Sequence, residues 1–391
     1  MKRFSQRTWI IIISAFVVIA IFFVSLAHLP HPPTIIPPPQ PPPTRTVAGP
    51  LPSPAPPLHV AGNQLLDNNK RAVRLLGVNR SGTEYQCLHS GIFDGPSDQA
   101  SIRAMLTWHI NAIRIPLNED CWLNVNMGKS PYGGFVYQRA IDNYVHLLIS
   151  NGITPILDLH WSAPGSQQAI GLQPLPDRDH SLAFWSQVAS TYRGNDAIIF
   201  DLFNEPYPDN NRDTTTAWKC WKNGTNKTDC PAGAAGLNYD AAGMQELVTA
   251  VRQMRATNVI MVGGIQYAAT LDHWIDYKPT DPINNLVPAW HPYNTAWCSD
   301  RTCWNTEVVP VMKRYPVIAG EIGENDAGSA FITQLMSFLD APARDVHPQS
   351  YLAWVWNTDQ TVYDLITDYT SGTPTNPYGL AFMRHLLSLP P

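Results

Sequence analysis

The sequence predicts an α/β fold of the (β/α)8 TIM-barrel class, and three observations lead to this prediction. Short apolar segments typical of buried parallel strands alternate with segments whose apolar residues recur at helical spacing. The alternation gives eight strands in about 330 residues, the size of such a barrel with its loops. Nearly every predicted strand ends in a polar or aromatic residue. An open doubly wound sheet is the alternative, but no glycine-rich phosphate-binding turn follows the first strand.

The predicted elements follow one another regularly along the chain. The strands span 73–79, 111–116, 153–160, 197–205, 258–264, 286–290, 316–320 and 351–356. Apolar residues at helical spacing predict helices at 97–109, 141–149, 185–192, 244–251, 306–314, 331–339 and 380–389. Before the first strand, residues 64–70 are typical of a small hairpin with a polar turn, which we expect to lie under the barrel.

The chain begins with a segment that we expect to direct export. An uncharged apolar run from Trp9 to Ala27 follows basic residues and is long enough to span a bilayer, with its N-terminus inside. A cleaved secretory signal is the alternative, because Ser25-Leu26-Ala27 resembles a cleavage site. Residues 29–58 are rich in proline and predict an extended linker. We therefore expect a membrane anchor or signal segment (1–28), this linker, and an extracellular catalytic domain (59–391), either anchored at the cell surface or secreted.

The cysteines agree with export, because disulfides persist in oxidising compartments. The chain has six of them, which lie in sequence-near pairs: Cys87 and Cys121, Cys220 and Cys230, Cys298 and Cys303. Sequence alone allows other pairings, but we expect these three because each would pin a loop without crossing the core. A zinc site is the alternative, but the chain has no Cys-x-x-Cys motif.

The C-terminal ends of the predicted strands carry residues able to bind, stack or transfer protons. They are Asn79, Arg114, His160, Asn204 with Glu205, His291 with Tyr293, Glu321 and Trp356. Glu205 closes the fourth strand and Glu321 the seventh, so a barrel would place two carboxylates across its mouth. Such a pair suits glycoside hydrolysis, in which one carboxyl donates a proton and the other attacks the anomeric carbon. Arg114 is a candidate for holding one carboxyl ionised. A buried ion pair is the alternative for any single residue.

The motifs around these residues resemble a known series. They are Asn-Ala-Ile-Arg-Ile-Pro at 111–116, Leu-Asp-Leu-His-Trp at 157–161, Asn-Glu-Pro at 204–206, His-Pro-Tyr at 291–293 and Gly-Glu-Ile-Gly at 320–323. In this order they are similar to the motifs of glycoside hydrolase family 5, particularly its bacterial endoglucanases (cellulases), over essentially all of residues 59–391. Around the first strand, the Asn-Arg-Ser-Gly segment departs from the commoner family patterns.

The resemblance implies a role for each residue of these motifs. Glu205 would be the acid/base and Glu321 the nucleophile of a retaining double displacement. By the same resemblance, Asn204 would hold the sugar 2-hydroxyl, Tyr293 and Arg114 would contact the nucleophile, and His160 and His291 would line the subsite being cleaved.

Tryptophans are the expected sugar platforms, because aromatic faces suit the apolar faces of β-linked glucose. We expect Trp356 to stack under the sugar, since it leads into a loop, although Trp354 lies two residues away on the same strand face. Trp161 and Trp274 are further candidates. Tryptophans also fill cores, and this alternative applies as well to the remaining candidates, Trp122, Trp297 and Trp304.

The sequence thus predicts a monomeric, endo-acting hydrolase whose partner is a β-linked polysaccharide or oligosaccharide, with β-1,4-glucan as the expected substrate. Mannan, xylan or another β-glycan is the alternative substrate, and a non-catalytic glycan-binding protein is the alternative class. The net charge of −5 argues against nucleic acid as a partner. No cofactor or metal is expected. Asp158, His160 and His291 could suggest a metal site, but an amidohydrolase would need His-x-His on the first strand, where this chain has Val78-Asn79-Arg80.

Overall fold

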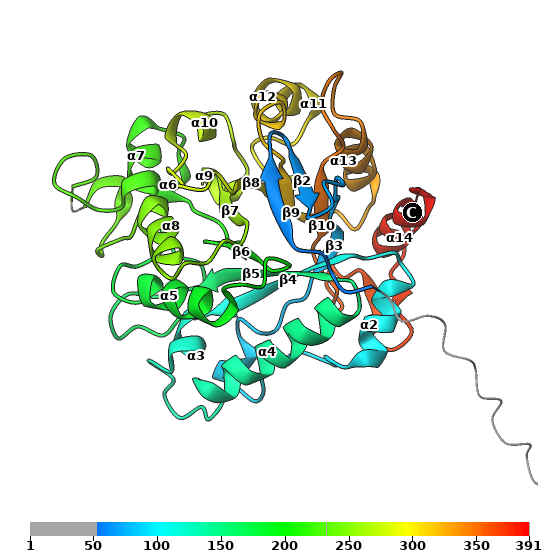
Figure 1. The fold of residues 1–391 in the computed structure, drawn as a ribbon, viewed down its shortest axis with the longest axis horizontal. Coiled ribbons are helices and arrows are strands. Elements are labelled where there is room, and N and C mark those ends of the chain that lie inside the picture. Colours follow the sequence, from blue (N-terminus) through cyan, green and yellow to red (C-terminus); the bar gives the residue numbers. More distant parts are fainter. Residues whose placement is uncertain (1–52, 232, 391) are drawn as a thin grey trace, which may run out of the picture. The chain divides into compact units, whose positions relative to one another are not determined.

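A computed structural model describes residues 53–231 and 233–390 of the 391-residue chain. Its centre is a closed barrel of eight parallel strands in the order β10-β3-β4-β5-β6-β7-β8-β9 (Figure 1). The strands are β3 (Leu76–Asn79), β4 (Ala112–Asn118), β5 (Thr154–Trp161), β6 (Ile199–Asp201), β7 (Ile260–Gly263), β8 (Leu286–Trp290), β9 (Ile318–Ile322) and β10 (Ser350–Ala353). The predicted barrel is therefore confirmed, and each predicted strand overlaps one of these eight.

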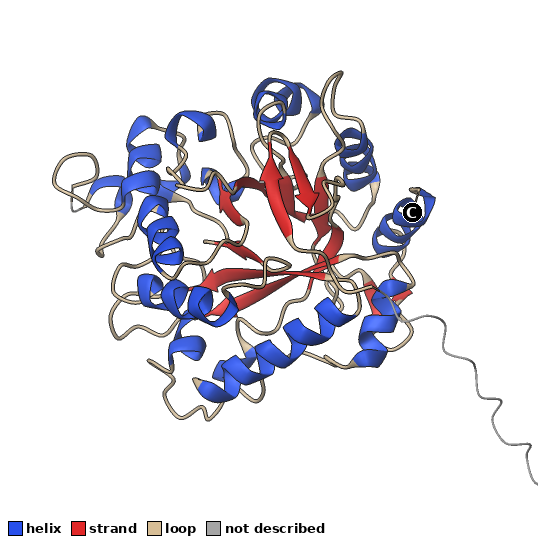
Figure 2. Cartoon of the chain, viewed as in Figure 1, coloured by secondary structure: helices blue, strands red, loops and turns tan. Residues whose placement is uncertain are grey.

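Helices surround the strands (Figure 2). The longer ones are α2 (Gln99–Leu106), α4 (Phe135–Ser150), α5 (Ser181–Tyr192), α7 (Thr215–Asn223), α8 (Met244–Gln253), α13 (Ala330–Asp340) and α14 (Tyr378–Ser388). Shorter helical segments are η1 (Gln86–Leu88), α3 (Glu119–Leu123), α6 (Pro208–Asn211), η2 (Ala234–Gly236), α9 (Ile265–Ala268), α10 (Trp274–Tyr277), α11 (Arg301–Cys303), η3 (Trp304–Val308) and α12 (Val309–Met312). Every predicted helix is present. Helix α4 begins earlier than expected because its first residues, Phe135 and Val136, are exposed and lie off the apolar stripe.

A hairpin covers one end of the barrel interior. It consists of β1 (Leu58–Ala61) and β2 (Gln64–Asp67). The hairpin predicted at 64–70 is also present, because a polar turn after β2 lets Leu66 form an antiparallel bridge with Ala72. In the β1–β2 hairpin, Leu58 and Leu65 pack in one buried cluster with inward-facing apolar residues of the barrel strands. Burying these leucines seals the amino-terminal end of the barrel, as expected. A second small sheet joins β11 (Ile366–Asp368) and β12 (Thr373–Pro374).

The inside of the barrel changes from apolar to charged along β4 and β6. On β4, Ala112 belongs to the apolar cluster, whereas Arg114, two residues further on, lies at the same inward face. On β6, Ile199 belongs to the cluster and Asp201 follows it by the same spacing. Arg114 and Asp201 meet across the barrel at 2.9 Å. Side chains two residues apart on a strand face the same side of the sheet. The polar residues that follow the apolar ones therefore also point into the barrel, nearer to its carboxyl end.

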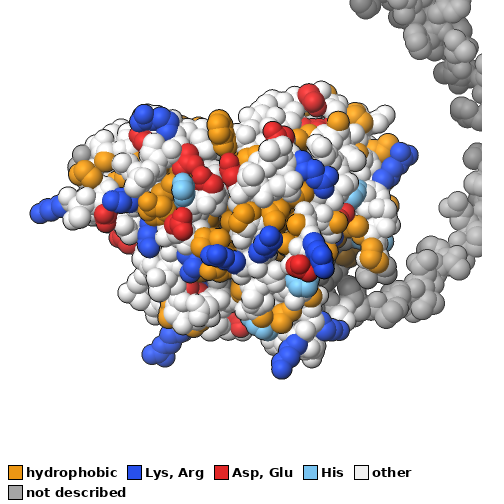
Figure 3. Space-filling model, turned by 90° about the horizontal axis from the view of Figure 1, so that it is seen from above, with side chains coloured by type: hydrophobic (Ala, Val, Ile, Leu, Met, Phe, Trp, Pro, Cys, Tyr) orange, Lys and Arg blue, Asp and Glu red, His pale blue; other side chains and the backbone are white. Residues whose placement is uncertain are grey.

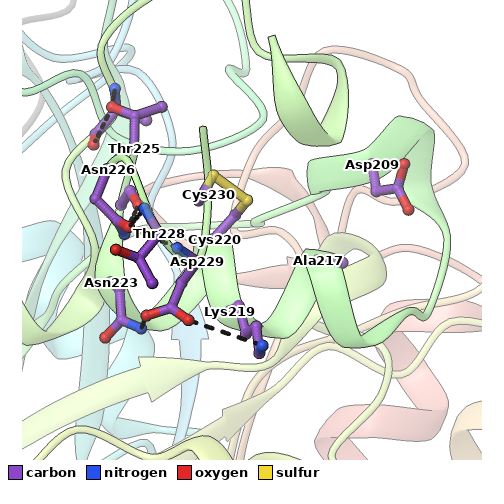
Figure 4. Close-up of a disulfide and its surroundings, with 12 residues drawn as sticks. Asp209, Ala217, Lys219, Cys220, Asn223, Thr225, Asn226, Thr228, Asp229 and Cys230 are labelled. Atoms are coloured by element: carbon purple, nitrogen blue, oxygen red, sulfur yellow. Dashed lines mark hydrogen bonds and ion pairs between the residues drawn. A yellow bond between two sulfur atoms is a disulfide. The ribbon is translucent and has the colours of Figure 1, made fainter. Parts of the chain in front are cut away.

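The three predicted disulfides, Cys87–Cys121, Cys220–Cys230 and Cys298–Cys303, are all present, which excludes the zinc alternative for these cysteines. Figure 4 shows the bond that joins α7 to the loop after it. Within this loop, Asn226 Oδ1 accepts hydrogen bonds from the backbone N–H groups of Thr228 and Asp229, at 2.9 and 2.7 Å. The disulfide and this turn together fix the loop (Figure 4).

The predicted apolar span Trp9–Ala27 and most of the predicted linker lie outside the described residues. Among the residues that the structure describes, no helix has both the length and the hydropathy needed to cross a membrane. Within the described residues, Ala55 is buried and donates its backbone N–H to the Ile149 carbonyl at 2.9 Å. On the face shown in Figure 3, basic and acidic side chains are interspersed, in agreement with the modest net charge.

Candidate active site

A cavity of about 590 Å³ opens where the strands end at their carboxyl side. Most of the predicted site residues line it, namely His160, Trp161, Asn204, Glu205, His291, Tyr293 and Glu321. Arg114 lies directly beneath them and is fully buried. The barrel therefore brings together residues that are more than 200 positions apart in the sequence, as with Arg114 and Glu321 (207 positions).

Both carboxylate oxygens of Glu321 are held by donors from other strands. Arg114 Nη1 donates to Oε1 at 2.8 Å, and the Tyr293 hydroxyl donates to Oε2 at 2.7 Å. Two donors on opposite oxygens leave the carboxyl group little freedom to turn, so these hydrogen bonds fix the orientation of Glu321. The contacts that the resemblance implied for Arg114 and Tyr293 are both present.

Arg114 also binds two buried aspartates that sequence reasoning did not assign to the site. Its Nη2 lies 3.0 Å from Asp158 Oδ1, and its Nε donates to Asp201 Oδ2 at 2.9 Å. The same guanidinium donates to Asn79 Oδ1 and to Asn204 Oδ1, at 3.1 and 2.7 Å. One cation thus organises three carboxylates and two amides at the base of the cavity. A sequence signal existed, since both aspartates interrupt otherwise apolar strands at inward positions.

Glu205 has a different environment from Glu321. Its Oε1 lies 3.2 Å from Nδ1 of His291, and its side chain is largely buried. Burial raises the pKa of Glu205 to about 7, against the opposing effects of His160 and Arg114. A substantial fraction of Glu205 is therefore protonated near neutral pH, which is what a proton donor requires.

The two histidines at the cavity are neutral near pH 7. Burial and the nearby Arg114 lower the pKa of His160 to about 4, and burial lowers that of His291 to about 4 as well. His160 Nδ1 lies 2.7 Å from Asp158 Oδ2, and the hydrogen bond between them orients the imidazole. The other ring nitrogen of His160 remains for a ligand in the cavity.

The two glutamates lie close to each other. One oxygen of Glu205 and one oxygen of Glu321 lie within 4.8 Å of each other and of a His291 ring nitrogen. By distance alone these three residues could also hold a metal ion. However, Arg114 and Tyr293 already donate to both oxygens of Glu321, and a guanidinium in contact with a carboxylate disfavours a second cation there. The arrangement favours proton transfer and nucleophilic attack.

The glycines around Glu321 make room for its neighbours. A Cβ on Gly320 would lie 2.9 Å from Nε2 of His291, and a Cβ on Gly323 would lie 2.5 Å from Cε1 of Tyr293. A residue larger than glycine could therefore occupy neither position unless the neighbouring side chain moved. The two glycines of the Gly-Glu-Ile-Gly motif are therefore needed for steric reasons. They leave room for His291 and Tyr293 to pack against the strand that carries Glu321.

Two of the predicted tryptophan platforms are wrong. Trp356 is fully buried, packs edge-on against Trp108 at 4.8 Å and does not line the cavity, whereas Trp354 does. Strand β10 ends at Ala353, before either tryptophan. The alternation of side chains along a strand therefore does not apply to Trp354 and Trp356, and the two indoles do not share a face. Trp274 is also buried, with its Nε1 donating to the Val262 carbonyl at 2.9 Å. It is a core residue.

The lining tryptophans are Trp161, Trp297 and Trp354. The ring of Trp354 stacks parallel to His160, with centroids 5.6 Å apart and planes 5° apart. Two tyrosines that sequence reasoning missed, Tyr267 and Tyr363, also line the cavity. Tyr267 lies in the short segment α9 after β7, and Tyr363 lies in the loop after β10. In neither place does a periodic pattern mark a residue as facing a site. The other candidates, Trp122 and Trp304, are buried.

The comparison with known proteins agrees with this geometry. A family model described as cellulase (glycosyl hydrolase family 5) matches residues 66–360. The chain belongs to this family. Curated relatives include endoglucanase A of Butyrivibrio fibrisolvens, 24% identical over 60% of this chain and 45% of the relative. Another is the manganese dependent endoglucanase Eg5A of Phanerodontia chrysosporium, 23% identical over 62% of this chain and 60% of the relative. The family 5 chain thus spans about half the length of these relatives.

Solved structures share the fold of this family 5 chain. The β-glucanase SdGluc5_26A from Saccharophagus degradans, in complex with cellotetraose, aligns with a TM-score of 0.62 and 20% identity over 88% of this chain and 98% of that one. The catalytic domain of Thermobifida fusca endoglucanase Cel5A aligns with a TM-score of 0.56 and 17% identity, over 85% of this chain and 97% of that one. At these identities the likeness concerns the barrel itself.

Proposed function

We propose that this family 5 protein is a retaining, endo-acting glycoside hydrolase that cleaves β-1,4-glucan. The observation that carries the proposal is the pair Glu205 and Glu321, with oxygens within 4.8 Å in two different environments. Retaining enzymes hold their two carboxyl groups about 5–5.5 Å apart, whereas inverting enzymes need about 6.5–9.5 Å to admit a water molecule. The short separation therefore supports retention.

The proposed reaction has two steps. In the first, a Glu321 oxygen attacks the anomeric carbon, the glycosidic C–O bond breaks, and Glu205 gives its proton to the departing oxygen. In the second, Glu205 removes a proton from water, the resulting hydroxide oxygen bonds to the anomeric carbon, and the bond to Glu321 breaks. Glu205 is thereby protonated again and Glu321 is ionised, so the protein returns to its starting state.

The remaining site residues would position the sugar and the nucleophile. Arg114 and Tyr293 hold Glu321 through the hydrogen bonds described above. Because Asn204 Oδ1 accepts from Arg114, its amide N–H groups are oriented as donors for the sugar 2-hydroxyl. His160 would donate or accept through its free ring nitrogen. Trp354, rather than Trp356, would stack under the sugar being cleaved.

The β-1,4-glucan substrate is supported by the relatives, which are named endoglucanases, and by the aromatic residues that line the cavity.

Reducing-end release from carboxymethylcellulose, barley β-glucan, mannan and xylan should be measured with the wild type and with Glu205→Gln and Glu321→Gln. We expect release from the two glucans and its loss in both variants. Full activity in either variant would exclude the mechanism, and release from mannan or xylan alone would exclude the substrate.

An extracellular location also belongs to the proposal. The three disulfides support it, since such bonds are rare in reducing compartments. Whether the domain is anchored or secreted depends on residues 1–28. The retention of a full-length tagged protein in the membrane fraction would identify an anchor, whereas a shortened protein in the medium would identify a cleaved signal.

The pH dependence of kcat/KM should follow the protonation of Glu205. Because only protonated Glu205 can donate, and its pKa is raised to about 7, kcat/KM should fall as pH rises above about 7, by about tenfold per pH unit. An unshifted carboxyl would cause this fall near pH 4.5 instead. On an aryl cellobioside with a good leaving group, which needs no acid, the wild type should lack this alkaline limb. An equally steep limb on that substrate would show that a group other than the proton donor causes it.

The Gly323→Ala variant should test the steric role of the glycine. The added Cβ would displace the Tyr293 ring and weaken its hydrogen bond to Glu321, so kcat should fall by about ten- to a hundredfold. Gly91→Ala is the control, because its Cβ would meet no atom closer than 3.9 Å. Both variants should be compared by kcat and melting temperature. Wild-type kcat in Gly323→Ala would contradict the role assigned to Tyr293.

A further inference from the structure

A second group of metal-ligating side chains lies outside the proposed active site. Glu119 opens α3 after β4, Asp177 and His180 lie just before α5, and one ligand atom of each lies within 4.8 Å of the others. Glu119 and Asp177 are fully buried, whereas the side chain of His180 is 20% exposed. None of the three lines the cavity around Glu205 and Glu321. The Glu119–Asp177–His180 cluster is therefore separate from the catalytic pair.

The two carboxyl groups of this cluster have no strong base to balance their charge. Among the described residues, no Lys or Arg forms an ion pair with Glu119 or Asp177, and only His180 lies within reach of both. Arg178, which is next to Asp177 in the sequence, pairs with two other carboxylates instead. Burying two carboxylates without a counter-ion is costly. The pair must therefore either share a proton or bind a cation.

The spacing within the cluster suits metal ligands better than hydrogen bonds. Nδ1 of His180 lies 3.6 Å from Asp177 Oδ1 and 3.8 Å from Glu119 Oε1. It also lies 3.3 Å from the carbonyl oxygen of Ala163, which follows β5. All three distances are longer than that of a strong hydrogen bond. Ligand atoms about 2.0–2.2 Å from a tetrahedral ion lie about 3.3–3.6 Å apart, close to the spacing observed.

Surrounding groups hold these ligand atoms in place. The Ser181 hydroxyl lies 2.6 Å from Glu119 Oε2 and 3.1 Å from Asp177 Oδ2, so it contacts the other oxygen of each carboxyl group. Nε2 of His180 lies 4.0 Å from Asp179 Oδ2. This anion favours the tautomer that carries its proton on Nε2, which leaves the lone pair of Nδ1 for a metal ion.

A buried hydroxyl lies beside the cluster in the sequence. Ser162 is 1% exposed and directly precedes Ala163, and its Oγ has no hydrogen-bond partner among the described residues. Buried hydroxyls normally have such a partner. An ion that keeps a bound water molecule would supply one.

We propose that this cluster, together with the Ala163 carbonyl, binds one Zn²⁺ ion that fixes the loop between β5 and α5. Two carboxylates and an imidazole suit zinc, whereas Ca²⁺ and Mg²⁺ take oxygen ligands. The ion is structural, because its ligands lie outside the cavity. Leu172 of the same loop does line the cavity, so the ion also supports one of its walls. The inference does not depend on the proposed function.

The test measures zinc binding by the full-length chain after a chelator has removed bound metals. Equilibrium dialysis against ZnCl₂ should give one ion per chain, and saturation should raise the melting temperature by about 5 °C. His180→Ala and Glu119→Gln should lose both effects. His180→Ala removes a partly exposed side chain, so its metal-free form should melt near the wild type. His273→Ala is the matched control and should keep both effects, because His273 forms a similar but exposed group with Asp213 and Asp272.

Glu321→Gln locates the ion relative to the catalytic pair, since Glu205, His291 and Glu321 also lie within 4.8 Å of one another. This variant should still bind one ion. Loss of zinc in Glu321→Gln and its retention in His180→Ala would place the ion at the catalytic pair and overturn the proposal. A wild type that binds no zinc would overturn it as well, in favour of a shared proton. Neither readout uses glycoside cleavage, so a failure of the proposed function leaves both unaffected.

Discussion

Glu321→Gln should lower kcat on β-1,4-glucan by about 10⁴-fold or more, because an amide cannot form the covalent glycosyl intermediate. The loss should persist on an aryl cellobioside with a good leaving group, since attack on the anomeric carbon fails whatever departs. Glu205→Gln should behave differently. It should lose activity on glucan but still release the activated phenol in a first turnover, because that step needs no proton donor.

Burst kinetics on the activated substrate distinguish the two variants. We expect a burst of phenol from Glu205→Gln, accelerated in steady state by azide, which attacks the intermediate without general-base help. No burst is expected from Glu321→Gln. Glu307→Gln is the control, because Glu307 lies on η3 outside the cavity. A burst from Glu321→Gln and none from Glu205→Gln would reverse the assigned roles.

Arg114→Met should be the most destabilising change at the site. Arg114 is fully buried and pairs with Asp158, Asp201 and Glu321 at 2.8–3.0 Å. Its removal leaves three buried carboxylates without their shared cation, a loss that typically costs about 3–5 kcal/mol in the free energy of unfolding. Activity should also be lost, because both Glu321 and Asn204 lose a hydrogen-bond donor.

Guanidinium unfolding measures the first effect and kcat the second. Arg71→Met is the matched control, because Arg71 forms an ion pair with Asp67 at 2.7 Å but is 73% exposed. Such exposed pairs contribute about 0–1 kcal/mol. Arg114→Lys keeps the charge without the planar set of donors and should fall between the wild type and Arg114→Met. A stability of Arg114→Met equal to that of Arg71→Met would contradict the central role of this guanidinium.

The strand pattern explains why the sequence predicts so much of this fold. Buried parallel strands are continuous apolar runs, and in a barrel their ends meet at one face. This rule alone brings Glu205 and Glu321 together, and it also places His160 and His291 at the cavity. The local disulfides follow from short sequence separations, such as the five positions between Cys298 and Cys303.

The features that sequence reasoning missed depend on three-dimensional closure. Asp158 and Asp201 interrupt apolar strands, and only the closed barrel shows that both face Arg114. Trp356 leads into a loop, which favours it as a sugar platform, but β10 already ends at Ala353 and Trp356 is buried. Tyr267 lies in the short segment α9 and stacks on Tyr207, which is 60 positions away in the sequence. Periodicity carries no information about such residues.

The anomeric form of the first product tests the central proposal most directly. Proton NMR should follow cleavage of cellopentaose by the wild type within the first minutes, before mutarotation mixes the anomers. Two successive displacements by Glu321 and water predict that the β-anomer appears first and the α-anomer only later. Initial release of the α-anomer would contradict the covalent role of Glu321 and with it the retaining mechanism.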